Sequence, residues 1–345
     1  MTSDLPIGHE LSDSEIRSSA AALLSTEVPD ADKAVFLKSL RERGETADEI
    51  AGFVDAFLDF AIDPELVVPE GKAIIDVCGT GGDGLHLFNV STAAMFVAAA
   101  GGVTVVKHGN RAITSKSGGA DILEALGIKI DVGPAIFRRC IAETDCGFMF
   151  APRYHPAFKV IAPVRRQLAA EGIPTIFNLL GPLLNPARPT LQLVGIFSEA
   201  AISKYAAVLQ KIGRRKAWAV HGKTADGQGM DEISTLGPTL VTEVAGETIR
   251  SFLLPAPENP PVIADLRGGD GSKNAEILEH ILRGGRGFPA ISEIVAVNAG
   301  AALVIADVAV DLTAGTAKAR EIIAAGIAWN KVEALREITL LPEGS

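Results

Sequence analysis

The segment 73–106, AIIDVCGTGGDGLHLFNVSTAAMFVAAAGGVTVV, decides the fold of this chain. A short apolar run at 73–77 leads into a glycine-rich loop, and an apolar stretch of helical length follows at 91–102. A second short apolar run stands at 103–106. Strand, loop, helix and strand in this order are typical of a βαβ unit, in which the two strands run parallel.

The same alternation continues along the chain. Further strands are predicted at 146–150, 191–197 and 216–220, and helices at 120–127, 155–172 and 199–213. The segment 239–254 breaks the rhythm and indicates an antiparallel hairpin, after which the helical patterning returns. Together these patterns predict an α/β fold with a mostly parallel central sheet.

Residues 1–70 carry helical signals only. Ser12 with Glu15, and Thr46 with Glu49, have the spacing of capping boxes at helix starts. The helices are followed by the linker sequence DPELVVPEG. We therefore expect a small helical domain before the α/β domain.

Composition limits the class of protein. The chain has 345 residues, of which 48% are hydrophobic, and this is typical of a folded globular protein. A net charge of −10 argues against nucleic acid as a partner, because binding to phosphate backbones needs a basic face. A small anionic substrate is still possible, since a local basic pocket or a metal ion reverses the local field.

The cysteines and the apolar stretches indicate the cellular compartment of the protein. An odd number of cysteines, 3, without paired metal-ligand spacing indicates buried free thiols in a reducing compartment. The N-terminus lacks the pattern of a signal peptide, and TAAMFVAAAGGVTVV is too short and too interrupted by glycine to span a bilayer. The sequence predicts a cytoplasmic protein with no membrane partner.

Three polar clusters follow predicted strands, at 78–92, 107–121 and 221–234. In open α/β sheets, ligands bind beyond the carboxyl ends of the strands, where loops from parallel strands meet. We therefore expect the three clusters to form one site.

The first cluster has the chemistry of an anion site. Its glycines let backbone N–H groups approach a ligand, and Asn89, Ser91 and Thr92 stand at the start of the next helix. No lysine ends the loop, so it is not a P-loop. The alternative interpretation is a tight strand-to-helix connection with a capping serine.

The second cluster is locally cationic in an acidic protein. Lys107, His108, Asn110 and Arg111 lie together, which suits a phosphorylated substrate. A solvated surface loop is the alternative. Asp121 is interpreted as a capping residue of the next helix.

The third cluster contains adjacent carboxylates, Asp231 and Glu232, on a glycine-rich loop. Carboxylate oxygens are the ligands that Mg²⁺ prefers, although such a pair is also common on protein surfaces. Taken together, the three clusters predict a site for Mg²⁺ and diphosphate.

Several motifs resemble those of the anthranilate phosphoribosyltransferase family. They are GTGGD (79–83), NVST (89–92), KHGNR (107–111), APVRRQL (162–168), TIFNLLGPLLNP (175–186) and MDEIS (230–234). GETADEIAGF, NAEIL and VNAGAAL extend the resemblance over nearly the whole chain.

The resemblance implies a helical domain (1–70, joined by part of 160–190) hinged to a catalytic α/β domain (71–345), and a homodimer formed through the helical domains. It implies transfer of the 5-phosphoribosyl group from phosphoribosyl diphosphate to the amine of anthranilate, in tryptophan biosynthesis. Both substrates are small molecules, and Mg²⁺ is the expected cofactor, with two ions.

The resemblance also implies site residues. Phosphoribosyl diphosphate is expected at Gly79, Gly82, Asp83, Asn89, Val90, Ser91, Thr92, Lys107, His108, Gly109, Asn110, Arg111, Ser115 and Gly119. Anthranilate is expected at Gly79, Asn110 and Arg165, and the metal at Ser91, Asp231 and Glu232. No general base is assigned.

Three positions depart from the family pattern. Leu87 stands where a hydroxyl residue is usual, and Gly119 stands where alanine or a small hydroxyl residue is usual. Thr114 replaces a common serine and keeps the hydroxyl. His86 is a candidate to replace the lost donor, with a solvent-facing histidine as the alternative.

Two other functions compete with this interpretation. A pyrimidine nucleoside phosphorylase shares the architecture but would not need Asp231 and Glu232, and its lysine-serine phosphate signature is missing. A non-catalytic paralogue that binds nucleic acid would need a basic patch, which this sequence lacks.

Overall fold

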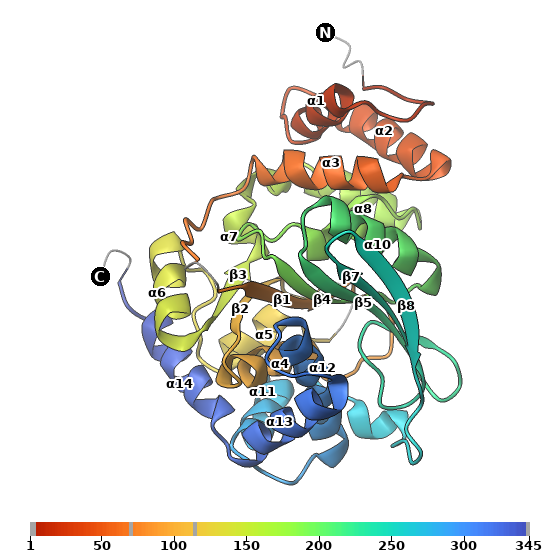
Figure 1. Ribbon diagram of the computed structural model, residues 1–345. Helices are drawn as coiled ribbons and strands as arrows, with labels where there is room; N and C mark the ends of the chain where they lie inside the picture. Colours follow the sequence, from red (N-terminus) through yellow and green to blue (C-terminus); the bar gives the residue numbers. More distant parts are fainter. Residues whose placement is uncertain (1–4, 69–71, 113–115, 343–345) are drawn as a thin grey trace.

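The computed structural model describes residues 5–68, 72–112 and 116–342. A central sheet of eight strands has the order β3-β2-β1-β4-β5-β7-β8, with β6 paired to β5 (Figure 1). The parallel strands are β1 (Ile74–Gly79), β2 (Thr104–Gly109), β3 (Cys146–Phe150), β4 (Leu191–Gly195) and β5 (Lys216–Lys223). The antiparallel strands are β6 (Gly229–Met230), β7 (Thr239–Ala245) and β8 (Thr248–Leu254).

The sheet confirms the predicted α/β architecture. The parallel strands all begin within one or two residues of the predicted apolar runs, and the predicted hairpin is β7 and β8. The two-residue strand β6 was not predicted, because it is too short to show a pattern.

Helices cover both faces of the sheet (Figure 1). On one face, α4 (Val90–Ala100), α12 (Pro289–Ile305) and α14 (Ala328–Thr339) lie against the strands, and α5 (Gly119–Ala125), α11 (Gly271–Leu282) and α13 (Leu312–Ala324) extend the same apolar cluster. On the other face, α10 (Ile202–Lys211) lies against the strands, and its apolar cluster continues into α8 (Ala162–Ala170) and α9 (Phe177–Leu180). Helix α6 (Pro134–Thr144) lies at the β3 edge and was missed by the sequence analysis.

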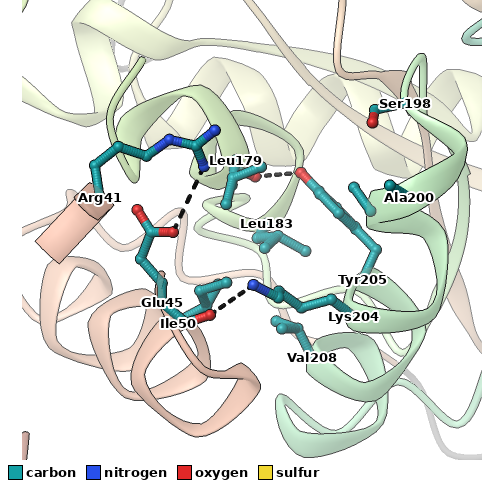
Figure 2. A pocket seen from close by; sticks show the side chains of 11 residues that line it. Arg41, Glu45, Ile50, Leu179, Leu183, Ser198, Ala200, Lys204, Tyr205 and Val208 are labelled. Atoms are coloured by element: carbon teal, nitrogen blue, oxygen red, sulfur yellow. Dashed lines mark hydrogen bonds and ion pairs between the residues drawn. The ribbon is translucent and has the colours of Figure 1, made fainter. Parts of the chain in front are cut away.

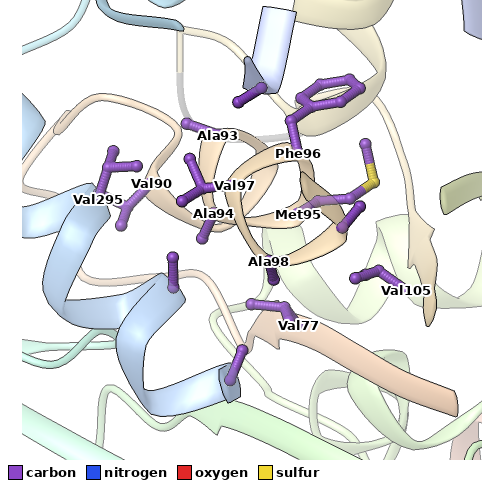
Figure 3. Packing of buried hydrophobic residues seen from close by; sticks show 14 of the residues in the cluster. Val77, Val90, Ala93, Ala94, Met95, Phe96, Val97, Ala98, Val105 and Val295 are labelled. Carbon is purple, nitrogen blue, oxygen red and sulfur yellow. The ribbon is translucent and has the colours of Figure 1, made fainter. Parts of the chain in front are cut away.

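Helix α4 is buried on all sides because most of its side chains are small and apolar. Figure 3 shows its alanine and valine side chains between Val77 of β1 and Val295 of α12. Ala93, Ala94 and Ala98 are 0% exposed, so the helix approaches its neighbours closely. This packing fixes the start of α4 against the end of β1.

The N-terminal helices are α1 (Asp13–Leu23), α2 (Asp30–Arg43) and α3 (Ala47–Leu58). Both predicted capping boxes are present, and Gly44 ends α2 with a positive φ of 85°. The apolar core of these helices continues into α8, α9 and α10. The division into two domains at residue 70 stays a prediction.

The segment predicted as one helix over 155–172 is not continuous. A short helix α7 (Ala151–Tyr154) ends before it, a 3₁₀ turn covers Pro156–Lys159, and α8 begins only at Ala162. Pro156 and Pro163 explain the interruption, because proline lacks an N–H donor and fits only the first turn of a helix. The prediction was therefore wrong for its first half.

Two smaller expectations can be checked against the described residues. Cys78, Cys140 and Cys146 are free and buried, as predicted. Among the described helices, none has both the length and the apolar character needed to cross a membrane.

Candidate active site

The three polar clusters lie together at the carboxyl ends of β1, β2 and β5. The Lys107 ammonium donates to the backbone oxygen of Val77 at 2.6 Å and to Ser91 Oγ at 3.2 Å, which joins the second cluster to the first. The backbone N–H of Gly81 donates to Asp231 Oδ2 at 2.7 Å, which joins the first cluster to the third. The predicted convergence is therefore present.

Glycines at the ends of three strands make room for residues 231–233, the acidic segment, which carries Asp231 and Glu232. A Cβ at Gly79 would collide with the Asp231 carboxylate, and one at Gly195 would collide with the Asp231 backbone. A Cβ at Gly222 would collide with the backbone oxygen of Glu232. The sequence suggested that Gly79 admits a ligand, and the structure shows that it first admits a carboxylate of the protein itself.

The acidic residues repel one another in a partly buried place. Burial and the nearby Asp83 raise the pKa of Asp231 to about 7. Burial and Asp231 raise the pKa of Glu232 well above its usual range, while Lys107 acts in the opposite direction. Negative charge that the protein leaves uncompensated favours a bound cation.

The described residues contain no group of three or more His, Cys, Asp and Glu side chains arranged to hold a metal. Mg²⁺ does not require one, since it is commonly held by one or two carboxylates together with water and substrate phosphates. Asp231 and Glu232 therefore fit an ion that arrives with a diphosphate.

The glycine loop presents its backbone to solvent. Gly81, Gly82 and Gly84 are exposed and have positive φ values of 68°, 91° and 68°, which favour glycine. Asp83 Oδ1 accepts from the Leu85 N–H at 3.1 Å and shapes the turn. At the start of α4, Val90 and Thr92 are buried.

The second cluster contributes fewer free cations than the sequence suggested. Arg111 makes a bidentate pair with Glu124, with distances of 3.0 and 2.7 Å, and lies over the Phe150 ring. Asn110 is exposed, and its Oδ1 accepts from the backbone of Arg111. Gly109 ends β2, and Ser115 lies outside the described residues.

Asp121 and Gly119 shape the second cluster where α5 begins. Asp121 accepts from the N–H groups of Gly118 and Ala112 at 2.7 and 2.9 Å, so its predicted capping role is confirmed. A Cβ at Gly119 would lie 3.0 Å from Thr92 Oγ1, which is tighter than ordinary van der Waals contact. Glycine at 119 therefore lets the starts of α4 and α5 come together.

Arg165 lies on α8 with its guanidinium 5.0 Å from the centre of the Phe177 ring. Within the described residues, no carboxylate pairs with it, and burial lowers its pKa. A partly buried cation without an anion is suited to an anionic ligand.

A chain of aromatic rings connects this arginine to the second cluster. The ring centres of His108 and His155 lie 5.2 Å apart, those of His155 and Phe158 lie 5.1 Å apart, and those of Phe158 and Phe177 lie 5.7 Å apart. The sequence analysis missed His155, Phe158 and Phe177. His155 and Phe158 lie three residues apart in RYHPAFKV, which looks like helical spacing, and Phe177 lies in a later segment. Only the fold brings the three rings together.

The two histidines are buried in neutral form. Burial lowers the pKa of His108 to about 3 and that of His155 to about 4. One nitrogen of each pairs with a backbone oxygen, at Gly181 and Leu184 respectively. His108 Nε2 and His155 Nδ1 have no hydrogen-bond partner among the described residues.

A separate cavity of about 220 Å³ lies between the N-terminal helices and α10 (Figure 2). Its charged groups already interact, since Lys204 donates to the backbone oxygen of Glu45 at 2.7 Å and Arg41 lies 3.9 Å from the Glu45 carboxylate. None of the predicted site residues lines this cavity.

Comparison with known families defines the class of this protein. The family described as "Glycosyl transferase family, a/b domain" matches residues 71–329. The family described as "Glycosyl transferase family, helical bundle domain" matches residues 6–61. The two matches place this chain in a class of glycosyl transferase built from a helical part and an α/β part.

Individual relatives narrow the class. The chain is 43% identical to the anthranilate phosphoribosyltransferase of Desulfatibacillum aliphaticivorans, over 96% of each chain. The crystal structure of the Thermus thermophilus enzyme aligns with a TM-score of 0.87 and 36% identity, covering 96% of this chain and 97% of that one. The Saccharomyces cerevisiae enzyme in complex with PRPP and Mg aligns with a TM-score of 0.82 and 27% identity, covering 95% and 93%. This chain belongs to the anthranilate phosphoribosyltransferase family.

Proposed function

We propose that this protein transfers the 5-phosphoribosyl group of phosphoribosyl diphosphate to the amine of anthranilate and releases diphosphate, as a step of tryptophan biosynthesis. One observation carries the proposal. Four parts of the site meet at the carboxyl ends of the parallel strands, namely the glycine loop, the start of α4, Lys107 and the acidic pair. The aromatic rings from His108 to Phe177 connect them to Arg165.

The diphosphate side uses backbone N–H groups and a metal. We assign Ser91, Asp231 and Glu232 to Mg²⁺, with two ions, and Lys107 to the phosphates through the Ser91 hydroxyl that it contacts. Mg²⁺ supplies neutralisation of the charge on the leaving diphosphate. The remaining phosphoribosyl diphosphate contacts are assigned to Gly79, Gly82, Asp83, Asn89, Val90, Thr92, His108, Gly109, Asn110, Arg111, Ser115 and Gly119.

Two of these residues have contacts within the protein that bear on their assigned roles. Arg111 is already paired with Glu124, so its side chain must change partner to reach a phosphate, whereas its backbone needs no such change. The His108 ring is buried against His155, so it must turn outward to reach a phosphate.

The anthranilate side uses Arg165 for the carboxylate, with Gly79 and Asn110. A planar guanidinium donates two parallel hydrogen bonds to a carboxylate, and the rings of Phe158 and Phe177 offer an apolar wall for the aromatic acid.

The reaction breaks the bond between the ribose carbon and diphosphate and forms a bond to the amine nitrogen, which then loses a proton. The aniline-type amine is already neutral, so the protein mainly positions the two substrates and stabilises the leaving group. Positioning alone contributes up to about 7–11 kcal/mol in ideal cases. No general base is assigned.

A fluorescence assay tests the proposal. Purified protein is given anthranilate and phosphoribosyl diphosphate, with and without Mg²⁺, and loss of anthranilate fluorescence is followed. We expect Mg²⁺-dependent turnover. No turnover, combined with phosphorolysis of a pyrimidine nucleoside, would favour the nucleoside phosphorylase alternative.

We also propose a homodimer formed through the helical domain. Two of its apolar side chains are exposed, Val35 of α2 at 56% and Phe60 at 43%. Sedimentation equilibrium distinguishes a dimer from the 36.0 kDa monomer, and Val35→Glu should shift the equilibrium toward monomer.

A further inference from the structure

The acidic segment has an unusual partner in helix α12. Asn298 is 0% exposed, and its Oδ1 accepts from the backbone N–H of Ile233 at 3.0 Å. Its Nδ2 donates to the backbone oxygens of Ile233 at 3.0 Å and of Ile294 at 2.9 Å. One side chain thus satisfies both backbone groups of the residue that follows Asp231 and Glu232.

This pairing replaces a strand neighbour that the segment lacks. Residues 231–238 form no strand, and Ile233 is 2% exposed, so its backbone groups are shielded from water. In the described part of the chain, the Ile233 N–H donates to Asn298 and to no backbone oxygen. Without Asn298, two buried backbone groups would lose their partner, which is costly in an apolar environment.

Asn298 is a polar side chain in an apolar helix. Its neighbours Val297 and Ala299 and most of α12 are apolar, and an aliphatic side chain in its place would leave the buried backbone groups of Ile233 unpaired. A fully satisfied amide in such a place fixes one geometry of the segment it holds. That segment carries the acidic pair.

We propose that Asn298 is a positioning residue for Asp231 and Glu232, acting through the Ile233 backbone. This inference rests on the proposed role of the two carboxylates as metal ligands. The strand-end glycines Gly79 and Gly195 let the segment approach from the sheet side, and Asn298 holds it from the helix side. The two constraints together set where the carboxylates stand.

The test compares Asn298→Leu with Leu303→Ala. Leucine keeps the branching of asparagine at Cγ and removes its hydrogen bonds. Leu303 is 0% exposed on the same helix and has no polar side-chain atom, so its variant measures the effect of general destabilisation. Asn298→Ala, which removes the hydrogen bonds without adding bulk, is the second variant in case leucine prevents folding.

Two readouts do not depend on turnover. Mn²⁺ binding in the presence of phosphoribosyl diphosphate is followed by electron paramagnetic resonance, and hydrogen exchange is followed for the peptide 229–236. We expect the Asn298 variants to weaken Mn²⁺ binding about 10-fold or more, since residues that orient metal ligands typically contribute roughly 10–100-fold. The peptide should exchange faster, and the KM for anthranilate should change less than about 2-fold.

Leu303→Ala should lower the melting temperature and leave Mn²⁺ binding unchanged. The inference is overturned if a folded Asn298 variant binds Mn²⁺ as tightly as the wild type. The double variant Asp231→Asn/Glu232→Gln separates this failure from a failure of the proposed function. If that variant also keeps full Mn²⁺ affinity, the acidic pair is not the metal site and the proposed function itself fails.

Discussion

The site has two regions that are built in opposite ways. One is the acidic segment, and the other is the ring cluster, which consists of His108, His155, Phe158 and Phe177 with Arg165. The acidic segment is tied by hydrogen bonds to the Gly81 backbone and to the Asn298 side chain, yet its carboxylates repel one another. In the ring cluster, Arg165 has no anion among the described residues, and His108 and His155 each keep an unpaired nitrogen. The first region has an excess of charge, and the second has an excess of hydrogen-bonding capacity.

This difference indicates which kind of ligand each region is suited to bind. A cation relieves repulsion between fixed carboxylates, so the acidic segment must be rigid before the cation arrives. A carboxylate with an aromatic body satisfies an unpaired guanidinium beside rings, so the second region needs only the correct groups within reach. The following predictions test this contrast.

The largest effect is expected in the acidic segment. Asp231→Asn/Glu232→Gln removes both charges and keeps similar shapes, so the fold should survive while turnover falls about 1000-fold or more. Steady-state kinetics at saturating Mg²⁺ and a circular dichroism spectrum check this. Near-normal turnover at ordinary Mg²⁺ would contradict the metal assignment.

Arg165→Lys should have a smaller and more selective effect. Lysine keeps the charge but cannot donate two parallel bonds, so the KM for anthranilate should rise about 10–100-fold. The KM for phosphoribosyl diphosphate should change little. Equal increases for both substrates would show that Arg165 acts through the fold, since its ring contact with Phe177 is also altered.

The sequence predicted which loops form the site, but it did not predict the residues that hold those loops in place. Strand ends in a parallel sheet meet at one edge, so local patterns were sufficient to bring 78–92, 107–121 and 221–234 together. Asn298 was hidden in an apolar helix, and its role depends on a contact with Ile233, 65 positions earlier in the chain. Nothing local to Asn298 indicates that contact.

The ring cluster was missed for a related reason. The sequence analysis predicted one helix over 155–172, which would have spaced its side chains along a single helix axis. The break at Pro156 and Pro163 instead turns His155 toward His108 and Phe158 toward Phe177. The proline signal was present in the sequence, but the partner rings come from segments that only the fold brings near.

The buried histidines predict a loss of stability in acid. A histidine whose pKa is lowered in the folded state is protonated more readily when unfolded. The folded state is therefore favoured fully above pH 6.5, and this contribution is lost as the pH falls toward the folded pKa of about 4 for His155. His155→Gln keeps a donor for the Leu184 oxygen and cannot be protonated.

Urea unfolding of the two proteins between about pH 6.5 and pH 4 measures this effect. The wild type should lose about 1–3 kcal/mol more than His155→Gln over that range. If the free energy of unfolding falls equally in both proteins, the His155 ring reaches water in the folded protein. The ring would then lie outside the part of the site that is shielded from water.

The smallest effect concerns Leu87, at the loop position where the resemblance implies a hydroxyl residue. Leu87 is half-buried against the core and pairs with Arg267 in an isolated antiparallel bridge, while His86 is exposed with a φ of +54°. We expect another group to replace the lost donor, so Leu87→Thr should tighten phosphoribosyl diphosphate binding by less than about 1 kcal/mol. His86→Asn, which tolerates the left-handed backbone, should weaken it clearly, because His86 is the nearest donor in the chain.

Calorimetry of both variants and of Arg267→Ala decides which group compensates. Arg267 shares the bridge with Leu87, and paired residues of an antiparallel bridge project to the same side, so its guanidinium is the rival donor. A loss in Arg267→Ala without a loss in His86→Asn would assign the compensation to the arginine. A large gain from Leu87→Thr with no loss in either variant would show that the loop is uncompensated. The diphosphate side would then lack a donor that its backbone and metal do not replace.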